Sequence, residues 1–203
     1  MERYKIIVNR NVFLPHYIPS ELRVRKREYE LLRNMILEPL RENGYCEGVV
    51  GIYGKQGSGK TMLLRKLQNE IESLGKPTAF SSLRGKDGLS SLHGLITKFI
   101  PKFPRRGYSL GESIDILAKI TDRSTVFLLD DVDKSRMKHK YVRALIVRLF
   151  EEGRPLVFSF SHTSIIDELG EDVSRFTSII YLEPYTSEEI YEILKQRAEK
   201  GLR

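Results

Sequence analysis

The chain has 203 residues, of which 40% are hydrophobic and 30% are charged. This composition predicts one core-forming α/β domain with a small appendage, and it excludes a disordered chain and two full-sized domains. There are 34 Lys and Arg residues against 27 Asp and Glu, a net charge of +7 that permits nucleic-acid binding without establishing it.

The single cysteine, Cys46, excludes an internal disulfide and a multi-cysteine metal site. The start of the chain shows no secretory signal, and no apolar run approaches the roughly 20 residues that span a bilayer. We therefore expect a cytoplasmic protein without a membrane partner.

Taken in chain order, the hydrophobic periodicity predicts helices that alternate with strands. Helices are expected at residues 20–41, 61–74, 89–100, 114–120, 138–152 and from 187 almost to the chain end. Strands are expected at residues 49–53, 77–83, 125–129, 155–160 and 178–182. Five apolar strands separated by helices predict a parallel, three-layer α/β sheet.

The most specific motif follows the first strand and reads Gly54-Lys55-Gln56-Gly57-Ser58-Gly59-Lys60-Thr61. It matches the phosphate-binding loop G-x-x-x-x-G-K-[ST], whose glycines let backbone N–H groups surround a phosphate. Lys60 is expected to reach the β and γ phosphate oxygens, and Thr61 to ligate Mg²⁺. The competing interpretation is a chance glycine turn, against which the strand–turn–helix context argues.

A second motif, Leu128-Leu129-Asp130-Asp131-Val132-Asp133, ends the third strand in acids. Beside a phosphate loop, Asp130 is expected to hold Mg²⁺ through water, and Asp131 to polarise the attacking water. Many ATPases of this kind use Glu at the second position, and Asp131 is one methylene shorter. The alternative is that these acids only cap a helix.

Four stretches carry a family resemblance. The first is Tyr17-Ile18-Pro19-Ser20-Glu21-Leu22 followed by Arg25, and the second is the pair of motifs above in the expected order. The third is Pro104-Arg105-Arg106-Gly107-Tyr108-Ser109-Leu110-Gly111, and the fourth is Glu183-Pro184-Tyr185-Thr186-Ser187-Glu188-Glu189-Ile190 with Ile193-Leu194 and Arg197-Ala198-Glu199. Together they resemble the ATPase domain of the archaeal origin-recognition and cell-division-control replication initiators, within the AAA+ superfamily. The phosphate loop alone is common to many families, whereas the third and fourth stretches together are much more specific.

The resemblance implies a P-loop NTPase fold of AAA+ type that binds ATP or ADP with Mg²⁺. It divides the chain into an N-terminal segment and helix (1–47), an ATPase core (48–183) and the start of a helical lid (184–203). In the N-terminal segment, Tyr17, Ile18, Pro19 and Arg25 match the family's adenine-binding positions.

The resemblance also implies binding to double-stranded origin DNA, together with initiator subunits or a helicase, and hence a nucleoid-associated location. The initiator-specific insertion falls at about residues 101–111, where Lys102, Arg105 and Arg106 are the expected DNA contacts. The alternative is a solvated loop with incidental charge.

Two further catalytic positions fit the family loosely. His162 stands where a sensor residue, commonly Asn, reads the γ-phosphate, and its alternative is a loop histidine without a special role. Arg175 stands where such ATPases present an arginine to a neighbouring subunit's nucleotide, and its alternative is a surface salt bridge.

Relatives carry a longer lid and a winged-helix DNA-binding domain beyond this point, so we expect either a fragment or a naturally shortened paralogue. The shortened acid, the substituted sensor and the incomplete lid predict weak hydrolysis. Two other functions stay open: a nucleotide-dependent assembly switch without DNA contact, and a small-molecule kinase, against which the lid-entry motif argues.

Overall fold

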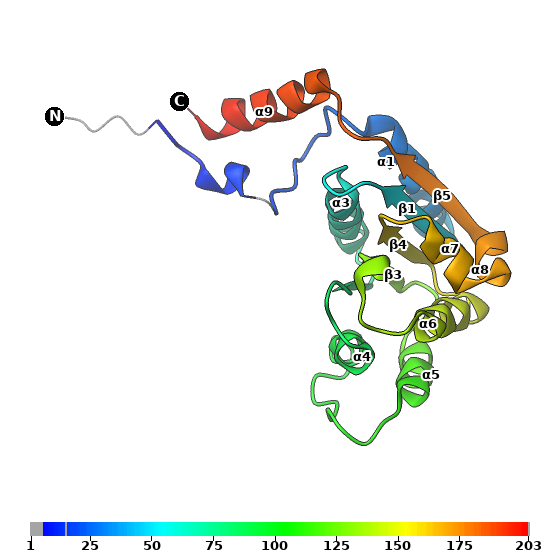
Figure 1. The fold of residues 1–203 in the computed structure, drawn as a ribbon. Coiled ribbons are helices and arrows are strands. Elements are labelled where there is room, and N and C mark those ends of the chain that lie inside the picture. The colour runs from blue at the N-terminus through cyan, green and yellow to red at the C-terminus, as the bar shows by residue number, and fades with distance from the viewer. Residues whose placement is uncertain (1–5, 15, 203) are drawn as a thin grey trace.

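The computed structural model describes residues 6–14 and 16–202. Its centre is a five-stranded parallel sheet with the strand order β2-β3-β4-β1-β5 (Figure 1). The strands are β1 (Val49–Gly54), β2 (Thr78–Ser82), β3 (Val126–Asp130), β4 (Leu156–Phe160) and β5 (Thr177–Leu182). The predicted α/β class with a parallel five-stranded sheet is confirmed.

Residues of the central strands are buried on both faces of the sheet. In β3, Phe127 and Leu129 join one hydrophobic cluster, while Val126 and Leu128 join a second cluster on the opposite face. All four side chains are fully buried. This explains why the strand reads as a continuous apolar run, as strands between two helical layers do.

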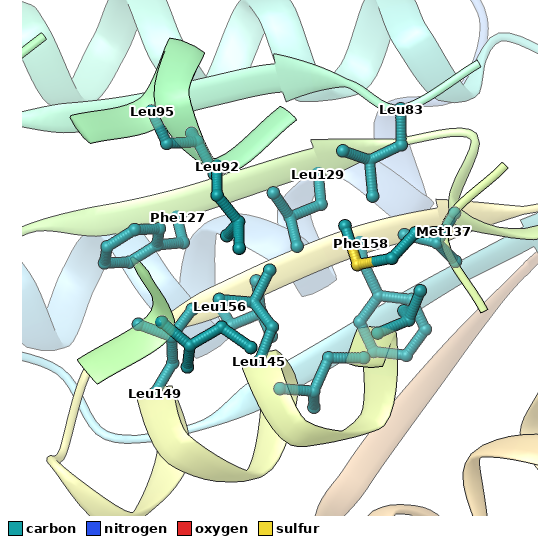
Figure 2. Close-up of a cluster of buried hydrophobic side chains, with 14 of the residues drawn as sticks. Leu83, Leu92, Leu95, Phe127, Leu129, Met137, Leu145, Leu149, Leu156 and Phe158 are labelled. Atoms are coloured by element: carbon teal, nitrogen blue, oxygen red, sulfur yellow. The ribbon is translucent and has the colours of Figure 1, made fainter. Parts of the chain in front are cut away.

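Helices form the two outer layers. One face of the sheet is covered by α1 (Lys26–Leu32), the π-helical turn η2 (Arg33–Leu37), α2 (Glu38–Asn43) and α3 (Lys60–Ser73). The other face is covered by α4 (Gly88–Ile96), α5 (Leu110–Ile120), α6 (His139–Glu151), α7 (Ser164–Leu169) and α8 (Glu171–Phe176). Figure 2 shows Leu92 of α4 and Leu145 of α6 packed against the sheet residues Phe127 and Phe158.

The single helix predicted over residues 20–41 is wrong in two respects. It begins only at Lys26, because Arg25 has a left-handed backbone with φ of 67°. It is also interrupted by η2, since Pro39 has no N–H to donate to the carbonyl of Met35. The Cys46 Sγ–H donates to that carbonyl instead, at 3.2 Å.

The second layer also differs from the predicted elements. Helix α5 begins at Leu110, four residues earlier than expected, because Ser109 and Glu112 form a capping box. Helix α4 ends at Ile96, so the irregular segment that contains the predicted insertion spans residues 97–109. Helices α7 and α8 were not predicted, because each has only six residues and Gly170 separates them.

The last helix, α9 (Ser187–Gly201), lies apart from the sheet beside the N-terminal segment (Figure 1). A capping box of Thr186 and Glu189 begins it. The N–H groups of Val8 and Asn9, which precede η1 (Arg10–Phe13), donate to the Gly201 carbonyl at its end, at 2.9 and 3.2 Å. Within residues 6–14 and 16–202, none of the helices combines the length and the apolar composition of a membrane-spanning segment.

The core makes a stability prediction. Leu145 is fully buried between α6 and the sheet, so Leu145→Ala leaves a cavity and should lower the free energy of unfolding by about 2–5 kcal/mol. The control Leu194→Ala changes a helical leucine that is 59% exposed and should cost less than about 0.5 kcal/mol. Urea unfolding of both variants measures the difference, and equal losses would contradict this account of the core.

Candidate nucleotide site

A cavity of about 310 Å³ opens between the phosphate loop, the N-terminal segment and α9. Its size is at the lower end of the range typical of small-molecule sites. The carboxyl ends of the parallel strands lie at one edge of the sheet, where the loops that follow them carry polar side chains to a common place. The residues lining the cavity are Tyr17, Pro19, Leu22, Arg23, Val24, Gln56, Gly57, Gly59, Lys60, Thr61, Met62, Arg84, Asp131, Lys134, Tyr185, Ile193, Gln196 and Arg197.

The phosphate loop connects β1 to α3, as the motif predicts. Lys60 Nζ lies over the loop and donates to the carbonyls of Gly54 at 2.6 Å and Lys55 at 3.0 Å. Burial lowers the pKa of the Lys60 ammonium, and the nearby Lys134 lowers it further, against the three carboxylates of Asp130, Asp131 and Asp133.

Asp130, the last residue of β3, joins the phosphate-loop helix α3 to β4. Its Oδ2 accepts a hydrogen bond from Thr61 Oγ1 at 2.8 Å, and its Oδ1 accepts one from Ser159 Oγ at 2.5 Å. The same Ser159 Oγ accepts a hydrogen bond from the N–H of Asp131 at 2.9 Å. The two predicted metal ligands are thus brought into contact: Thr61 lines the cavity, and Asp130 lies directly behind it, outside the lining residues.

Both carboxylate oxygens of Asp131 are held by cations. Arg84 Nε donates to Oδ2 at 2.9 Å, and Lys134 Nζ donates to Oδ1 at 3.0 Å. Burial alone would raise the pKa of this carboxyl, but the hydrogen bonds from Arg84 and Lys134 outweigh it, so the pKa lies below its ordinary value. Asp131 is therefore a carboxylate at neutral pH, with φ of 55° in the left-handed region.

Four polar residues of this site were missed by the sequence reasoning: Arg84, Lys134, Ser159 and Ser161. Lys134 Nζ also donates to Ser161 Oγ at 3.3 Å, and the Ser161 N–H donates to Asp133 Oδ2 at 3.0 Å. Ser159 lies near the end of β4, and Ser161 and Arg84 follow the ends of β4 and β2. A search for polar residues at the carboxyl ends of all five strands would have found three of the four.

The predicted adenine-binding residues separate into two groups. Tyr17 and Pro19 line the cavity, and the Arg197 guanidinium of α9 lies 5.9 Å from the centre of the Tyr17 ring. Ile18 and Arg25 are not among the lining residues. Arg25 is buried and donates to the carbonyls of Ser58, at 3.3 Å, and of Glu183.

Arg25 therefore does not line the cavity but holds the surrounding backbone in place from behind it. Its guanidinium also lies 4.3 Å from the centre of the Tyr185 ring, so one side chain connects the phosphate loop to the junction between β5 and α9. Stacking of a guanidinium on an aromatic face adds to the hydrogen bonds that hold it.

The two remaining catalytic predictions lie on the surface. His162 is exposed and is not among the residues that line the cavity. The Arg175 side chain is 79% exposed at the end of α8, 3.3 Å from Glu171 one turn earlier. A role for Arg175 thus requires a second molecule, and both roles stay predictions.

The predicted DNA contacts, Lys102, Arg105 and Arg106, are exposed in the segment 97–109. An aromatic contact closes this segment: the rings of Phe103 and Tyr108 stack with centres 4.9 Å apart. His93 Nε2 lies 3.1 Å from the Phe103 carbonyl and fixes the segment to α4. The two arginines project from the part of the loop between these two anchoring rings.

Comparisons with known proteins agree with the geometry. The family model for the AAA family, ATPases associated with various cellular activities, matches residues 50–184. An ORC1-type DNA replication protein 2 of Aeropyrum pernix is 29% identical and matches 100% of this chain but 56% of its own length. The ORC1-type DNA replication protein 2 of Sulfurisphaera tokodaii is 27% identical over 92% of this chain and 49% of its own length.

Solved structures share the fold. Cdc6p from Pyrobaculum aerophilum superimposes with a TM-score of 0.82 at 23% identity, over 98% of this chain and 55% of that one. The Aeropyrum pernix ORC1 protein in complex with DNA gives a TM-score of 0.76 at 23% identity, over 98% and 55%. The predicted resemblance to archaeal replication initiators and the AAA+ fold are confirmed, and the chain spans about half the length of these relatives.

The phosphate loop makes a second prediction. Gly57 and Gly59 both have positive φ, +86° and +101°, so alanine at either should cost about 1–2 kcal/mol of stability in backbone strain. At Gly59 a new Cβ would also lie 2.4 Å from the Tyr185 hydroxyl, whereas at Gly57 it meets nothing within 4 Å. Gly59→Ala should therefore lower the melting temperature more than Gly57→Ala.

The double variant Gly59→Ala with Tyr185→Phe is the control. It removes the clashing hydroxyl and leaves the next ring atom at 3.4 Å, so it should recover the difference between the two alanine variants. Melting temperatures that are the same for Gly57→Ala and Gly59→Ala would contradict the close approach of Tyr185 to the loop.

Proposed function

Because this chain belongs to the AAA family of ATPases, we propose that it binds ATP with Mg²⁺ in the 310 Å³ cavity and hydrolyses it slowly, as the ATPase domain of a replication initiator. The observation that carries the proposal is the contact between Thr61 and Asp130, at 2.8 Å beside the phosphate loop. It unites the two oxygen ligands that a phosphate-bound magnesium ion needs from the protein.

The residues present fit a magnesium–nucleotide group. A Thr hydroxyl and an Asp carboxylate are hard oxygen donors of the kind that Mg²⁺ accepts, and such a site uses few protein ligands because phosphates and water supply the rest. Ser58 Oγ is buried without a hydrogen-bond partner among the described residues, but Ser58 does not line the cavity, so the fit rests on the donor pair of Thr61 and Asp130. When bound, the metal would neutralise charge on the β and γ phosphates.

The protein groups around the phosphates have separate tasks. Lys60 holds an ammonium directly over the loop, where it would pair with phosphate oxygens. Arg84 and Lys134 add two more cations to the wall of the cavity. On the opposite wall, Tyr17, Pro19 and Ile193 offer the apolar surfaces that a purine ring packs against.

Slow hydrolysis follows from the state of Asp131. A carboxylate activates water by accepting its proton, yet both oxygens of Asp131 accept hydrogen bonds from cations. The lowered pKa makes the carboxylate a weaker base as well. Faster turnover would require Arg84 or Lys134 to leave Asp131, and a neighbouring subunit to supply an arginine such as Arg175.

Nucleotide binding makes the third prediction. Lys60→Ala removes the ammonium over the loop, so titration calorimetry with ATP and Mg²⁺ should show an affinity at least about tenfold weaker than that of the unmodified chain. The control Lys119→Ala removes an exposed lysine of α5 that does not line the cavity and should leave ATP affinity unchanged. If the unmodified chain does not bind ATP, or Lys60→Ala binds equally well, the proposal fails.

The proposal includes contact with duplex DNA through the segment 97–109. Three exposed cations, Lys102, Arg105 and Arg106, stand on a loop anchored by the Phe103–Tyr108 stack, and one of the solved relatives was determined in complex with DNA. A loop of fixed shape loses less entropy on binding than a free one. Initiator subunits or a helicase are the proposed protein partners, at the nucleoid.

The fourth prediction concerns that contact. Arg105→Ala with Arg106→Ala should weaken duplex binding and reduce the slope of log affinity against log salt by about 2, one for each lost phosphate contact. Fluorescence anisotropy at several salt concentrations measures both. An unchanged slope would contradict the contact, and a chain that binds ATP but no DNA would favour a nucleotide-dependent assembly switch.

A further inference from the structure

Two loops at the carboxyl edge of the sheet pair to form a short antiparallel ribbon. Residues 84–87 follow β2, and residues 134–138 run from the turn after β3 to the start of α6. The Gly85 N–H donates to the Lys134 carbonyl at 2.9 Å, and the Arg136 N–H donates to the Lys86 carbonyl at 3.0 Å. We call these two segments, with Lys140 in the first turn of α6, the basic ribbon.

Side chains alternate along the second segment of the basic ribbon. Met137 is 3% exposed and belongs to the core cluster, while its neighbours Arg136 and Lys138 are exposed. Ser135 turns inward as well: its Oγ accepts the Met137 N–H at 3.0 Å and donates to the Lys86 carbonyl at 3.4 Å. The buried Met137 and the Ser135 contacts thus fix the backbone from which the two cations project.

The exposed side of the basic ribbon is strongly positive. Lys86, Arg136, Lys138 and Lys140 are exposed, and within residues 6–14 and 16–202 no carboxylate lies within 4 Å of their charged groups. The nearby Asp87 is engaged, because its two oxygens accept the N–H and Oγ–H of Ser90 at 2.9 and 2.8 Å. None of the four cations is thus paired with a carboxylate: Glu168 contacts His139 instead, and Lys140 Nζ lies 5.0 Å from the centre of the Tyr141 ring.

This charge opposes local stability. The first turn of α6 carries no acidic residue, and Lys138 and Lys140 stand at the end of the helix where positive charge is unfavourable. Residues that cost stability in the free protein are expected where a ligand of opposite charge is bound.

We propose that the basic ribbon binds the phosphate backbone of a nucleic acid. Two residues of extended chain span about 6.6 Å, so Arg136 and Lys138 can each contact a different phosphate along one strand. Protein–protein interface cores are depleted of lysine and rich in apolar side chains, whereas nucleic-acid interfaces are strongly positive. Within residues 84–90 and 134–140, Leu89 is the only exposed large hydrophobic residue, which favours nucleic acid over an acidic protein.

This surface is separate from both sites described above. Lys86, Arg136, Lys138 and Lys140 do not line the nucleotide cavity, and they lie outside the segment 97–109. The inference extends the proposed nucleic-acid binding to a second place on the chain, and it depends neither on ATP nor on Arg105 and Arg106.

The test compares three variants of the same chain. Arg136→Gln with Lys138→Gln changes the ribbon, Arg105→Gln with Arg106→Gln changes the insertion, and Lys119→Gln with Arg123→Gln removes the same two positive charges from exposed positions around the end of α5. Anisotropy with a labelled duplex and with its single strand, at several salt concentrations, gives affinities and salt slopes. Melting temperature and ATP titration report folding.

The ribbon variant should bind at least one nucleic-acid probe about tenfold more weakly, with a salt slope reduced by about 2, while its ATP affinity stays unchanged. The probe that loses affinity identifies the form of nucleic acid. The inference is overturned if the unmodified chain binds neither probe, or if the ribbon variant behaves like the charge control.

Two further outcomes separate the proposals. Loss of binding in the insertion variant alone would support the insertion and overturn the ribbon, and loss in the ribbon variant alone would do the reverse. Labelled polyglutamate serves as a third probe, in place of an acidic protein. If the ribbon variant loses binding to polyglutamate but keeps both nucleic-acid affinities, the surface binds an acidic protein and the inference fails.

Discussion

The site is organised around the Asp130 carboxylate. One oxygen accepts from Thr61 on the phosphate-loop helix, and the other accepts from Ser159 on β4. Ser159 in turn receives the Asp131 N–H and so fixes the turn that carries the second acid. A buried carboxylate is tolerated only when hydrogen bonds compensate for its lost hydration, and here those bonds come from two separate elements, α3 and β4. Their relative positions are therefore fixed before any ligand arrives.

A second constraint, the buried side chain of Arg25, joins the phosphate loop to the junction between β5 and α9. Arg25 adopts a left-handed backbone, which is uncommon for a residue with a side chain and costs of order 1–2 kcal/mol. Its buried guanidinium recovers that cost through the carbonyls of Ser58 and Glu183 and the face of Tyr185. The phosphate loop, the end of β5 and the start of α9 thus share one cation. A movement of α9 would therefore be transmitted through Arg25 to the phosphate loop.

Positive charge is distributed around the site in two ways. Arg84 and Lys134 are bound to Asp131, where they restrain the acid that the proposed reaction needs. Lys86, Arg136 and Lys138, on the same two loops, point to solvent without carboxylate partners among the described residues. The paired backbone of residues 84–86 and 134–136 carries both sets, so the cations that hold Asp131 and the exposed cations belong to one hydrogen-bonded unit.

Interactions between residues close together in the sequence determined most of the secondary structure and the phosphate-binding turn, so these could be predicted from the sequence alone. The apolar runs predicted five strands, and residues 54–61 predicted a phosphate-binding turn, because glycine spacing and strand–turn–helix order act over a few residues. The prediction of one long first helix is wrong because the missing N–H of Pro39 and the contacts of Arg25 change the backbone locally. The tertiary structure alone decided which distant polar groups meet: that Arg84 holds Asp131, that Ser159 supports Asp130, and that Arg25 lies outside the cavity lining and holds the phosphate loop through Ser58. These pairings join residues tens of positions apart, and only the order of strands in the sheet sets which loop ends stand side by side.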